Sequence, residues 1–374
     1  MTDLRIAVVG LKGVGKGHVQ ALARHPRTDL VAVADVAADA AAQTAEEYGA
    51  TAYTDYRELL DKQQLHAIVF ATPHHLHAPM ALDALEAGVH TFVEKPLAIR
   101  VSEGDRMVQT ARDKNLVLAV GHNYRTFPGN VKLKEILDSG QLGTVHRVLW
   151  QWLENRNEAY YQRDIWRCTW RHAGGGVLMN QTSHDLDLLC WLVGRPVEVS
   201  AMIANQAHEH EVEDTAIASI RFANSAFANV QLSTYSHRLN YRQITGDNGT
   251  ILFQDERNAN VNIPETFRLG LYPHSNRALI RGDTPGTQQP EPDWRDVDCS
   301  DATSPKLLES FVDAALGGEP PITDGASALV TLELINAIIL SGVRRKVVSL
   351  PIDRDEYDEL FDELSSGKTK VSGA

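Results

Sequence analysis

The sequence predicts an α/β domain with a doubly wound parallel sheet, followed by an α+β domain with an open, mainly antiparallel sheet. Three observations predict this. Strand and helix patterns alternate over the first 120 residues, and the strands there are short apolar runs, as in strands buried on both faces. After residue 140 the strands are longer and alternate polar with apolar residues. We therefore expect domains at residues 1–122 and 123–374.

The elements of the first domain follow from these patterns. The predicted strands cover residues 4–9, 30–35, 67–72, 91–93 and 116–121. The helices between them end near residues 25 and 48 and then span about 76–87 and 102–114. Ser102 and Asp105 have the spacing of a capping box, so we expect the last of these helices to begin there.

The second domain is predicted to open with a helix and continue as a sheet. The helix covers residues 129–139, and strands cover 145–153, 197–205, 215–222, 226–235, 242–246 and 250–253. Residues 223–225 and 246–249 are predicted hairpin turns. A mobile loop is expected at 284–294, helices near 304–316 and 325–342, and a frayed tail after residue 367.

Charge and cysteine content exclude several classes of protein. The 374 residues include 36 basic and 49 acidic ones, a net charge of −13, which disfavours nucleic acid and anionic membranes as partners. The three cysteines (Cys168, Cys190 and Cys299) are far apart and odd in number, so we expect reduced thiols in a cytoplasmic protein. The most apolar window, residues 326–343, is interrupted by polar residues and is predicted to be too polar and too short to span a membrane.

The first strand runs into a glycine-rich turn at residues 10–15. A dinucleotide site needs a tight turn, a close backbone approach and a helix N-terminus aimed at the pyrophosphate, as in a Rossmann domain. Gly10 and Gly15 occupy the first and third glycine positions, whereas Lys12 occupies the second and Gly13 follows it. We predict that the turn contacts the cofactor through Gly10, Lys12, Gly13, Val14 and Gly15.

Asp35 ends the second strand, at the distance from the glycines expected of a ribose-binding carboxylate. Such a carboxylate accepts hydrogen bonds from ribose hydroxyls and repels a 2′-phosphate, which favours NAD. A cation at Lys12 keeps NADP open as an alternative. The competing interpretation is an ordinary strand-to-helix turn with a solvated aspartate.

Glu94, Lys95 and Pro96 follow the strand at residues 91–93. Ligands bind at the carboxyl ends of parallel strands, and a lysine beside a positively charged cofactor ring is a plausible proton carrier. A surface ion pair between Glu94 and Lys95 is the alternative.

A run of three glycines at 174–176 leads into a helix that carries Asn180 and His184. The two residues are four apart and share a face if the helix starts early. His184 titrates near neutrality and suits acid–base work. The alternative is a buried structural histidine.

Other polar and aromatic segments give weaker signals. Residues 72–77 follow a strand and are predicted to line the cofactor cleft rather than bind metal, since no carboxylate or cysteine partner is near. Residues 208–211 are expected in an exposed strand end or loop. Aromatic residues at 160–161 and 166–170 fit either a sugar face or an ordinary core. No nucleophile motif is present.

At these residues the sequence resembles the Gfo/Idh/MocA family (glucose–fructose oxidoreductase and inositol dehydrogenase). The glycine turn followed by His18, the Glu94-Lys95-Pro96 motif and the segment from the glycines to His184 and Asp187 carry the resemblance over essentially the whole chain. In similar enzymes the lysine and an Asp-x-x-x-His pair surround the carbon that exchanges hydride with the nicotinamide. This chain has Asn180 in place of that aspartate, and an amide orients a substrate but carries no proton.

The resemblance implies a set of site residues and a homodimer or homotetramer that packs through the open sheet. The implied catalytic residues are Lys95, Asn180 and His184. Cofactor contacts beyond the turn are expected from Asp35, Thr72, Pro73, His74, His77, Glu94, Lys95 and Asn123. Substrate contacts are expected from Lys95, Arg125, Tyr160, Trp166, Arg167, Asn180 and His184.

We therefore expect an NAD-dependent dehydrogenase that oxidises a ring secondary alcohol of a sugar, sugar derivative or cyclitol, without a metal. His184 is the expected general base, Lys95 assists it, and Asn180 holds a neighbouring hydroxyl. Two alternatives remain open at this point: a glycosidase that oxidises and re-reduces its substrate with bound NAD, and a non-catalytic sensor that binds the dinucleotide.

Overall fold

The computed structural model describes residues 4–255, 267–283, 291–300 and 302–371 and contains two compact units. The first unit comprises Met1–Asn123, Arg171–Gly174 and Pro305–Leu332, and the second Tyr124–Trp170, Gly175–Ser304 and Glu333–Ala374. The first boundary between the units falls after residue 123, one residue beyond the boundary predicted between residues 122 and 123. Unlike the single predicted boundary, this division also assigns the two short segments after residue 123 to the first unit. Each unit is described by itself.

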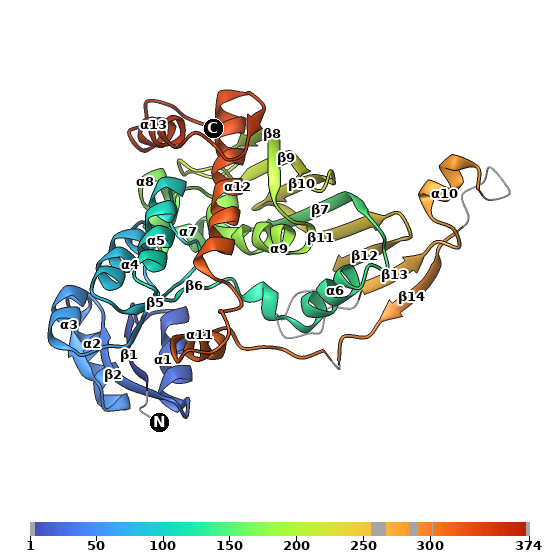
Figure 1. Cartoon of the computed structure of the whole chain (residues 1–374). Coiled ribbons are helices and arrows are strands. Elements are labelled where there is room, and N and C mark those ends of the chain that lie inside the picture. The colour runs from blue at the N-terminus through green and yellow to red at the C-terminus, as the bar shows by residue number, and fades with distance from the viewer. Residues whose placement is uncertain (1–3, 256–266, 284–290, 301, 372–374) are drawn as a thin grey trace. The chain divides into compact units, whose positions relative to one another are not determined.

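The first unit contains a six-stranded, wholly parallel sheet with the order β3-β2-β1-β4-β5-β6. Figure 1 labels β1, β2, β5 and β6 of this sheet. The order reverses beside β1, which is the doubly wound arrangement expected from the sequence. Its strands are β1 (Leu4–Val9), β2 (Thr28–Ala34), β3 (Thr51–Tyr53), β4 (Ala67–Phe70), β5 (His90–Val93) and β6 (Leu118–Val120). Strand β4 is buried at every residue, and β1 is buried except at Arg5, as their apolar runs predict.

Helices on the chain between these strands bury apolar stripes against the sheet. They are α1 (Val14–Arg24), α2 (Ala38–Tyr48), α3 (Tyr56–Lys62), α4 (His77–Glu86) and α5 (Val101–Asp113), joined in the same unit by α11 (Leu307–Ala315). Phe311 and Val312 of α11 complete the core beside β1. The start of α5 corrects one prediction: Arg100 and Glu103, not Ser102 and Asp105, form its capping box.

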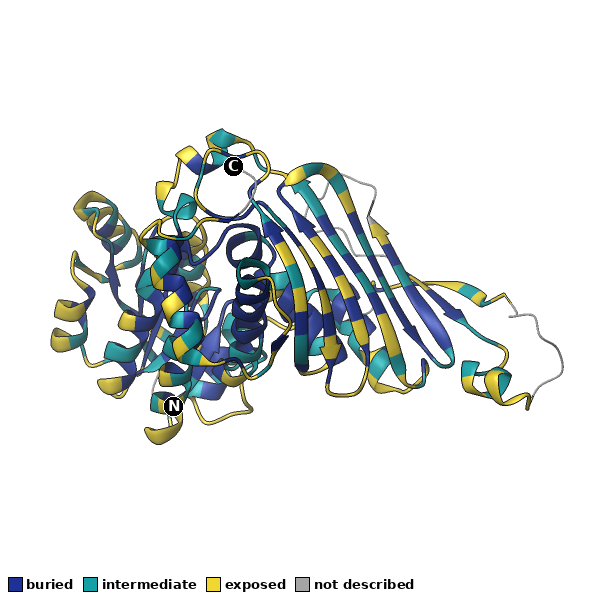
Figure 2. Ribbon diagram, turned by 90° about the horizontal axis from the view of Figure 1, so that it is seen from above, coloured by how far each residue is buried: buried dark blue, intermediate teal, exposed yellow. Residues whose placement is uncertain are grey.

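The second unit is built on a nine-stranded sheet with the order β14-β13-β12-β11-β7-β10-β9-β8-β15. All described pairs are antiparallel except β7 with β10. The strands are β7 (Val145–Asn155), β8 (Pro196–Ala204), β9 (Thr215–Phe222), β10 (Phe227–Ser233), β11 (Tyr235–Gly246), β12 (Gly249–Asp255), β13 (Phe267–Leu271), β14 (Asp293–Val297) and β15 (Val348–Ser349). Buried and exposed residues alternate along β9 and β10 (Figure 2), so one face of the sheet is buried and the other is open.

Short helical segments connect and cover this sheet. They are α6 (Pro128–Asp138), α7 (Glu158–Gln162), η3 (Ile165–Cys168), η4 (Val177–Gln181), α9 (Ser183–Val193), α10 (Asn276–Arg281) and α13 (Arg354–Ser365). Helix α8 (Trp170–Ala173) belongs to the first unit from Arg171 onward. Residues 284–290 of the predicted mobile loop lie outside the described residues, and β14 begins at Asp293. The three cysteines are free thiols in the structure.

Helix α12 (Gly325–Arg344) is, among the described helices, the one long and apolar enough to cross a membrane by length and composition. The prediction that this segment is too short was wrong, since the helix has 20 residues and an apolar window of mean hydropathy 1.8. However, 67% of that window is buried inside the structure, and Glu333 and Asn336 are buried as well. These are the properties of a core helix.

Candidate active site

Packing explains two of the glycines in the turn between β1 and α1. Gly10 has φ +87°, and a Cβ there would lie 2.4 Å from the Ala71 carbonyl oxygen. A Cβ on Gly15 would lie 1.9 Å from the Gly10 carbonyl oxygen. Gly13 has φ +55° in open space, so its conformation rather than its packing requires glycine. The turn keeps its tight geometry although Lys12 stands at the second motif position.

The N-terminus of α1 is suited to bind an anion. Gly13 caps the helix without a side-chain hydrogen bond, and the first turn contains no acidic residue. Lys12, Gly13 and Val14 are exposed there. First-turn N–H groups and the helix dipole attract phosphate, and the close-packed glycines let the backbone approach it. The turn therefore fits the pyrophosphate of a dinucleotide.

Asp35 lies directly beside this turn. It follows β2, and its carboxylate oxygens accept hydrogen bonds from the backbone N–H groups of Leu11 and Ala37, both at 2.9 Å. The side chain is half-buried. Strand, glycines, helix and acid thus occupy the arrangement that the sequence predicts for a dinucleotide site.

Lys95 follows β5 at the carboxyl end of the parallel sheet. Its neighbour Glu94 is 2.7 Å from Nε2 of His18 on α1, and the Glu94 carboxylate also packs over Gly121, where a Cβ would lie 2.6 Å from an oxygen. Burial raises the pKa of Glu94, but the His18 hydrogen bond and the charges of His18 and Lys95 outweigh it and hold the pKa below its usual value. Glu94 is therefore more than the surface partner of Lys95. The Lys95–Pro96 peptide is cis.

The histidines that follow β4 support the backbone around this motif. His77 is fully buried, with Nδ1 2.7 Å from the Pro96 carbonyl and Nε2 2.8 Å from the Thr72 carbonyl. His74 is also buried, with Nδ1 2.8 Å from the Ala173 carbonyl. Both rings lie inside the unit, and cofactor contact by this segment stays a prediction. Among the described residues, no group of three or more His, Cys, Asp or Glu side chains is arranged to hold a metal ion.

In the second unit, the glycine run ends in the π-helical turn η4. Gly176 and Leu178 donate backbone hydrogen bonds to the Glu213 side chain at 2.9 and 3.0 Å, and Val177 donates to the Glu213 carbonyl at 2.9 Å. A Cβ on Gly176 would lie 1.9 Å from that carbonyl oxygen. The predicted continuous helix is thus divided at Thr182, with Asn180 in η4 and His184 in α9.

Asn180 and its neighbour Gln181 meet the predicted aromatic segment. The Asn180 Oδ1 accepts a hydrogen bond from Nη1 of Arg167 at 2.8 Å, and Gln181 donates to the Tyr160 hydroxyl at 2.7 Å. The Arg167 guanidinium lies over the Trp166 ring, 4.4 Å from its centroid. The structure thus brings together four residues predicted from the sequence: Tyr160, Trp166, Arg167 and Asn180.

His184 stacks on Tyr124, with ring centroids 4.7 Å apart and 17° between planes. The imidazole is half-buried. Stacking leaves the edge of the ring, which carries its nitrogens, as the part that exchanges protons.

Two buried carboxylates of α9 fix the helix that carries His184. Asp187 forms a two-pronged ion pair with Arg125, at 2.8 and 2.6 Å. Asp185 accepts hydrogen bonds from Trp150 Nε1 and Arg242, both at 3.0 Å. Arg125 is 4% exposed and its guanidinium supports α9, and its predicted contact with substrate stays a prediction.

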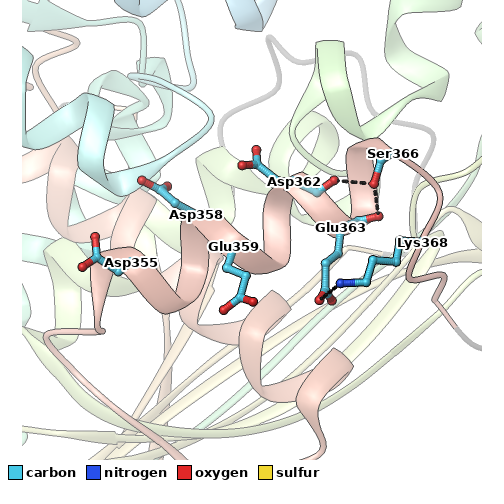
Figure 3. A pocket seen from close by; sticks show the side chains of 7 residues that line it. All are labelled: Asp355, Asp358, Glu359, Asp362, Glu363, Ser366 and Lys368. Atoms are coloured by element: carbon cyan, nitrogen blue, oxygen red, sulfur yellow. Dashed lines mark hydrogen bonds and ion pairs between the residues drawn. The ribbon is translucent and has the colours of Figure 1, made fainter.

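Two other polar clusters lie outside this arrangement. His208, expected to be exposed, is buried between Asp214 at 3.0 Å and the Arg156 carbonyl at 2.6 Å, and these partners raise the pKa of the imidazole against the opposing effect of burial. A surface hollow on α13 is lined mainly by acidic side chains (Figure 3). No predicted site residue lines that hollow.

Comparison with known families agrees with both units. Residues 4–122 match the oxidoreductase family with an NAD-binding Rossmann fold, and residues 130–252 match the Gfo/Idh/MocA C-terminal domain. The chain belongs to the Gfo/Idh/MocA family. It is an NAD-dependent dehydrogenase, and the fit of the glycine turn and Asp35 to a dinucleotide is the structural counterpart of that assignment.

Several Gfo/Idh/MocA proteins are similar over most of the chain. Levoglucosan dehydrogenase from Pseudarthrobacter phenanthrenivorans is 30% identical over 292 residues, 69% of this chain and 75% of that protein. Myo-inositol 2-dehydrogenase from Thermotoga maritima is 26% identical, covering 69% of this chain and 77% of that protein. The structure of the WlbA dehydrogenase from Chromobactrium violaceum with NADH and UDP-GlcNAcA has a TM-score of 0.79 at 27% identity, covering 94% and 97% of the two chains.

The sequence did not predict the residues that support the segments carrying Asn180 and His184. Glu213 and Tyr124 contact the segments of Asn180 and His184, yet neither lies in a predicted motif. Gln181 lies in the segment from the glycines to His184 and had no predicted role. Glu213 is 37 residues from Gly176. The only available signal was a glutamate at the start of a predicted strand, where a polar side chain is ordinary.

Proposed function

We propose that this dehydrogenase oxidises a ring secondary alcohol of a sugar, sugar derivative or cyclitol to the ketone. The single observation that carries the proposal is the placement of Lys95, which follows β5 in the same unit as the glycine turn and Asp35. Ligands of such sheets bind outside the carboxyl ends of the strands. The similarity to levoglucosan and myo-inositol dehydrogenases supports a polyhydroxylated ring as substrate.

The roles of the chain's own residues follow from their chemistry. NAD, when bound, supplies the hydride acceptor. His184 takes the proton of the reacting hydroxyl, and Lys95 donates a hydrogen bond to the same oxygen. Asn180 holds a neighbouring hydroxyl, because its amide orients but does not carry a proton. The exposed turn residues Lys12, Gly13 and Val14 hold the pyrophosphate, and Asp35 binds the adenosine ribose.

The test is the formation of NADH, followed by absorbance, with NAD or NADP and a panel of aldoses, glycosides, amino sugars, uronates and inositols. Lys95→Ala and His184→Ala are each expected to lower kcat by about 100- to 10,000-fold, as loss of a general acid–base group does. Lys62→Ala on α3 and His146→Ala on β7, both exposed, are the matched controls. Wild-type turnover in both site variants would overturn the assignment.

The two alternative functions give different results in the same assay. A glycosidase that uses NAD transiently would release free sugar from glycosides without net NADH. A sensor would bind NAD and show no turnover on any ring. The sensor remains an alternative because Asn180 departs from the Asp-x-x-x-His pattern. Turnover that depends on both Lys95 and His184 would exclude the sensor.

We also propose a cytoplasmic homodimer or homotetramer that packs through the open face of the sheet. Large apolar side chains are exposed on β8, β9 and β10, where Met202 is 77%, Ile217 49% and Phe227 57% exposed. A group of exposed apolar side chains on one sheet face is typical of an interface. Light scattering after gel filtration tests this, and a wild-type monomer would contradict it.

A further inference from the structure

The Arg167 guanidinium is held in a fixed orientation within the second unit. Nη1 donates to the Asn180 Oδ1 at 2.8 Å, and the guanidinium carbon lies 4.4 Å from the Trp166 ring centroid and 5.6 Å from that of Tyr160. Stacking on two aromatic rings restricts rotation of the long side chain. Less entropy is therefore lost when a ligand binds to it.

The aromatic support is itself tied to the segment that carries Asn180. The Tyr160 hydroxyl accepts a hydrogen bond from Nε2 of the Gln181 side chain at 2.7 Å, and Oε1 of the same side chain accepts one from Nε of Arg156 at 3.2 Å. Asn180 thus holds Arg167 by a direct hydrogen bond, and Gln181 holds Tyr160, over whose ring the Arg167 guanidinium lies. This places the guanidinium next to the residue to which we assign a substrate hydroxyl.

The positive charge of Arg167 is weakly compensated. Its ion-pair partner is Asp164, at 3.3 Å with a side chain 50% exposed, whereas Arg156 pairs at 2.7 Å with Glu154, whose side chain is 15% exposed. Exposed ion pairs contribute little. Asn180 adds no charge beside it. The hydrogen bonds described for Arg167 use Nη1, to Asn180, and Nε, to Asp164.

We propose that Arg167 binds the carboxylate of an acidic sugar, so that the preferred substrates are uronic acids or their derivatives. This deepens the proposed function and rests on it, because it places the substrate beside Asn180. A guanidinium presents parallel N–H donors that match a planar carboxylate, and charge-assisted bonds of this kind are stronger than those to neutral hydroxyls. A neutral sugar would leave this charge with the half-exposed Asp164 as its ion-pair partner.

The experiment compares sugars that differ only at one carbon. We would measure kcat/KM for methyl glucuronide against methyl glucoside, and for methyl galacturonide against methyl galactoside. The wild type is expected to favour the uronide at least tenfold. Arg167→Gln should abolish that ratio, chiefly by raising KM for the uronide, and Arg167→Lys should restore part of it. Arg163→Gln, the same charge change at an exposed position of the same segment, should leave the ratio as in the wild type.

The outcomes separate this inference from the proposed function. Oxidation of neutral sugars without preference for uronides overturns the role of Arg167 and leaves the dehydrogenase assignment intact. If no sugar is turned over, titration of the NADH complex with glucuronate and glucose still decides: tighter glucuronate binding that is lost in Arg167→Gln supports the inference, and equal binding overturns it. Glucose 6-phosphate bound as tightly as glucuronate would also overturn the assignment to a carboxylate.

Discussion

The Glu213 carboxylate lies against the backbone of Gly176, whose N–H is 2.9 Å from each of its two oxygens. A third hydrogen bond comes from Leu178, at 3.0 Å. The glycine at 176 leaves room for this approach, since a Cβ there would overlap the Glu213 carbonyl. A fully buried acid thus shapes the turn that presents Asn180.

We expect Glu213 to make stability depend on pH. Burial raises the pKa of Glu213 to about 7, against the opposing effect of the Gly176 and Leu178 hydrogen bonds. In the unfolded chain this carboxyl has a pKa of about 4.3. Between pH 4.3 and pH 7 the native protein therefore keeps the Glu213 proton, whereas the unfolded chain has lost it. The protonated Glu213 side chain contributes about 3 kcal/mol to the free energy of unfolding at low pH, and this contribution disappears as the pH rises to 7.

Glu213→Gln removes this titration. The difference in unfolding free energy between wild type and variant, from denaturant melts at pH 5 to 8, should change by a few kcal/mol in favour of the variant as pH rises. Titration of other groups such as His208 is common to both proteins and cancels. Glu209→Gln, an exposed glutamate of the same loop, should show no such trend. Parallel pH profiles for wild type and Glu213→Gln would contradict the prediction.

Gly15 and Gly17 offer a matched test of the cofactor turn. A Cβ at Gly15 would lie 1.9 Å from a backbone oxygen, whereas one at Gly17 would meet nothing within 4 Å. Gly15→Ala should lower the thermal midpoint and weaken NAD binding at least tenfold, seen as loss of the NAD-induced rise in Tm. Gly17→Ala should stabilise α1 by about 0.5–1 kcal/mol and keep the NAD effect. Equal NAD binding by both variants would refute the packing argument.

The fold was predictable where local pattern and burial agree. Strand β1, which is buried except at Arg5, has its predicted bounds, and the parallel sheet follows from such apolar runs. The three-residue β3 and the helix α3 after it were missed, because β3 has no buried residue and gives no apolar run. Burial there is decided by neighbouring elements, which the local sequence does not contain.

The site was predictable to the level of its motif residues but not of their supports. Asn180 and His184 were expected to share a face if their helix started early, but the structure places Asn180 in η4 and His184 in α9. Glu213, distant in sequence, binds the backbone of Gly176 and Leu178 just before Asn180. Arg125 was assigned to substrate, yet it pairs with Asp187, 62 residues away. Such long-range polar pairs leave no periodic signal in the sequence.

Asp35 is expected to set the choice between NAD and NADP. Its carboxylate lies at the glycine turn, held by Leu11 and Ala37, and would accept hydrogen bonds from ribose hydroxyls and repel a 2′-phosphate. Asp35→Ser should weaken NAD binding by about ten- to hundredfold, the range of hydrogen bonds to a charged group, and raise the ratio of kcat/KM for NADP over NAD. Asp39→Ser, exposed on α2, is the control. An unchanged ratio in Asp35→Ser would show that another residue makes the selection.

The Arg125–Asp187 pair beneath α9 should be strongly coupled in stability. Both side chains are nearly inaccessible, at 5% and 0% exposure, so removing one partner leaves a buried charge without its counterion. Arg125→Met and Asp187→Leu should each cost about 3–5 kcal/mol, and the double variant distinctly less than their sum. Denaturant melts of the four proteins measure that coupling.

The Arg221–Glu198 pair on the sheet, at 3.0 Å but 45% and 38% exposed, is the matched comparison and should couple by no more than about 1 kcal/mol. Because the buried pair holds the helix that carries His184, additive losses at Arg125 and Asp187 would mean that packing of α9, rather than the ion pair, fixes His184.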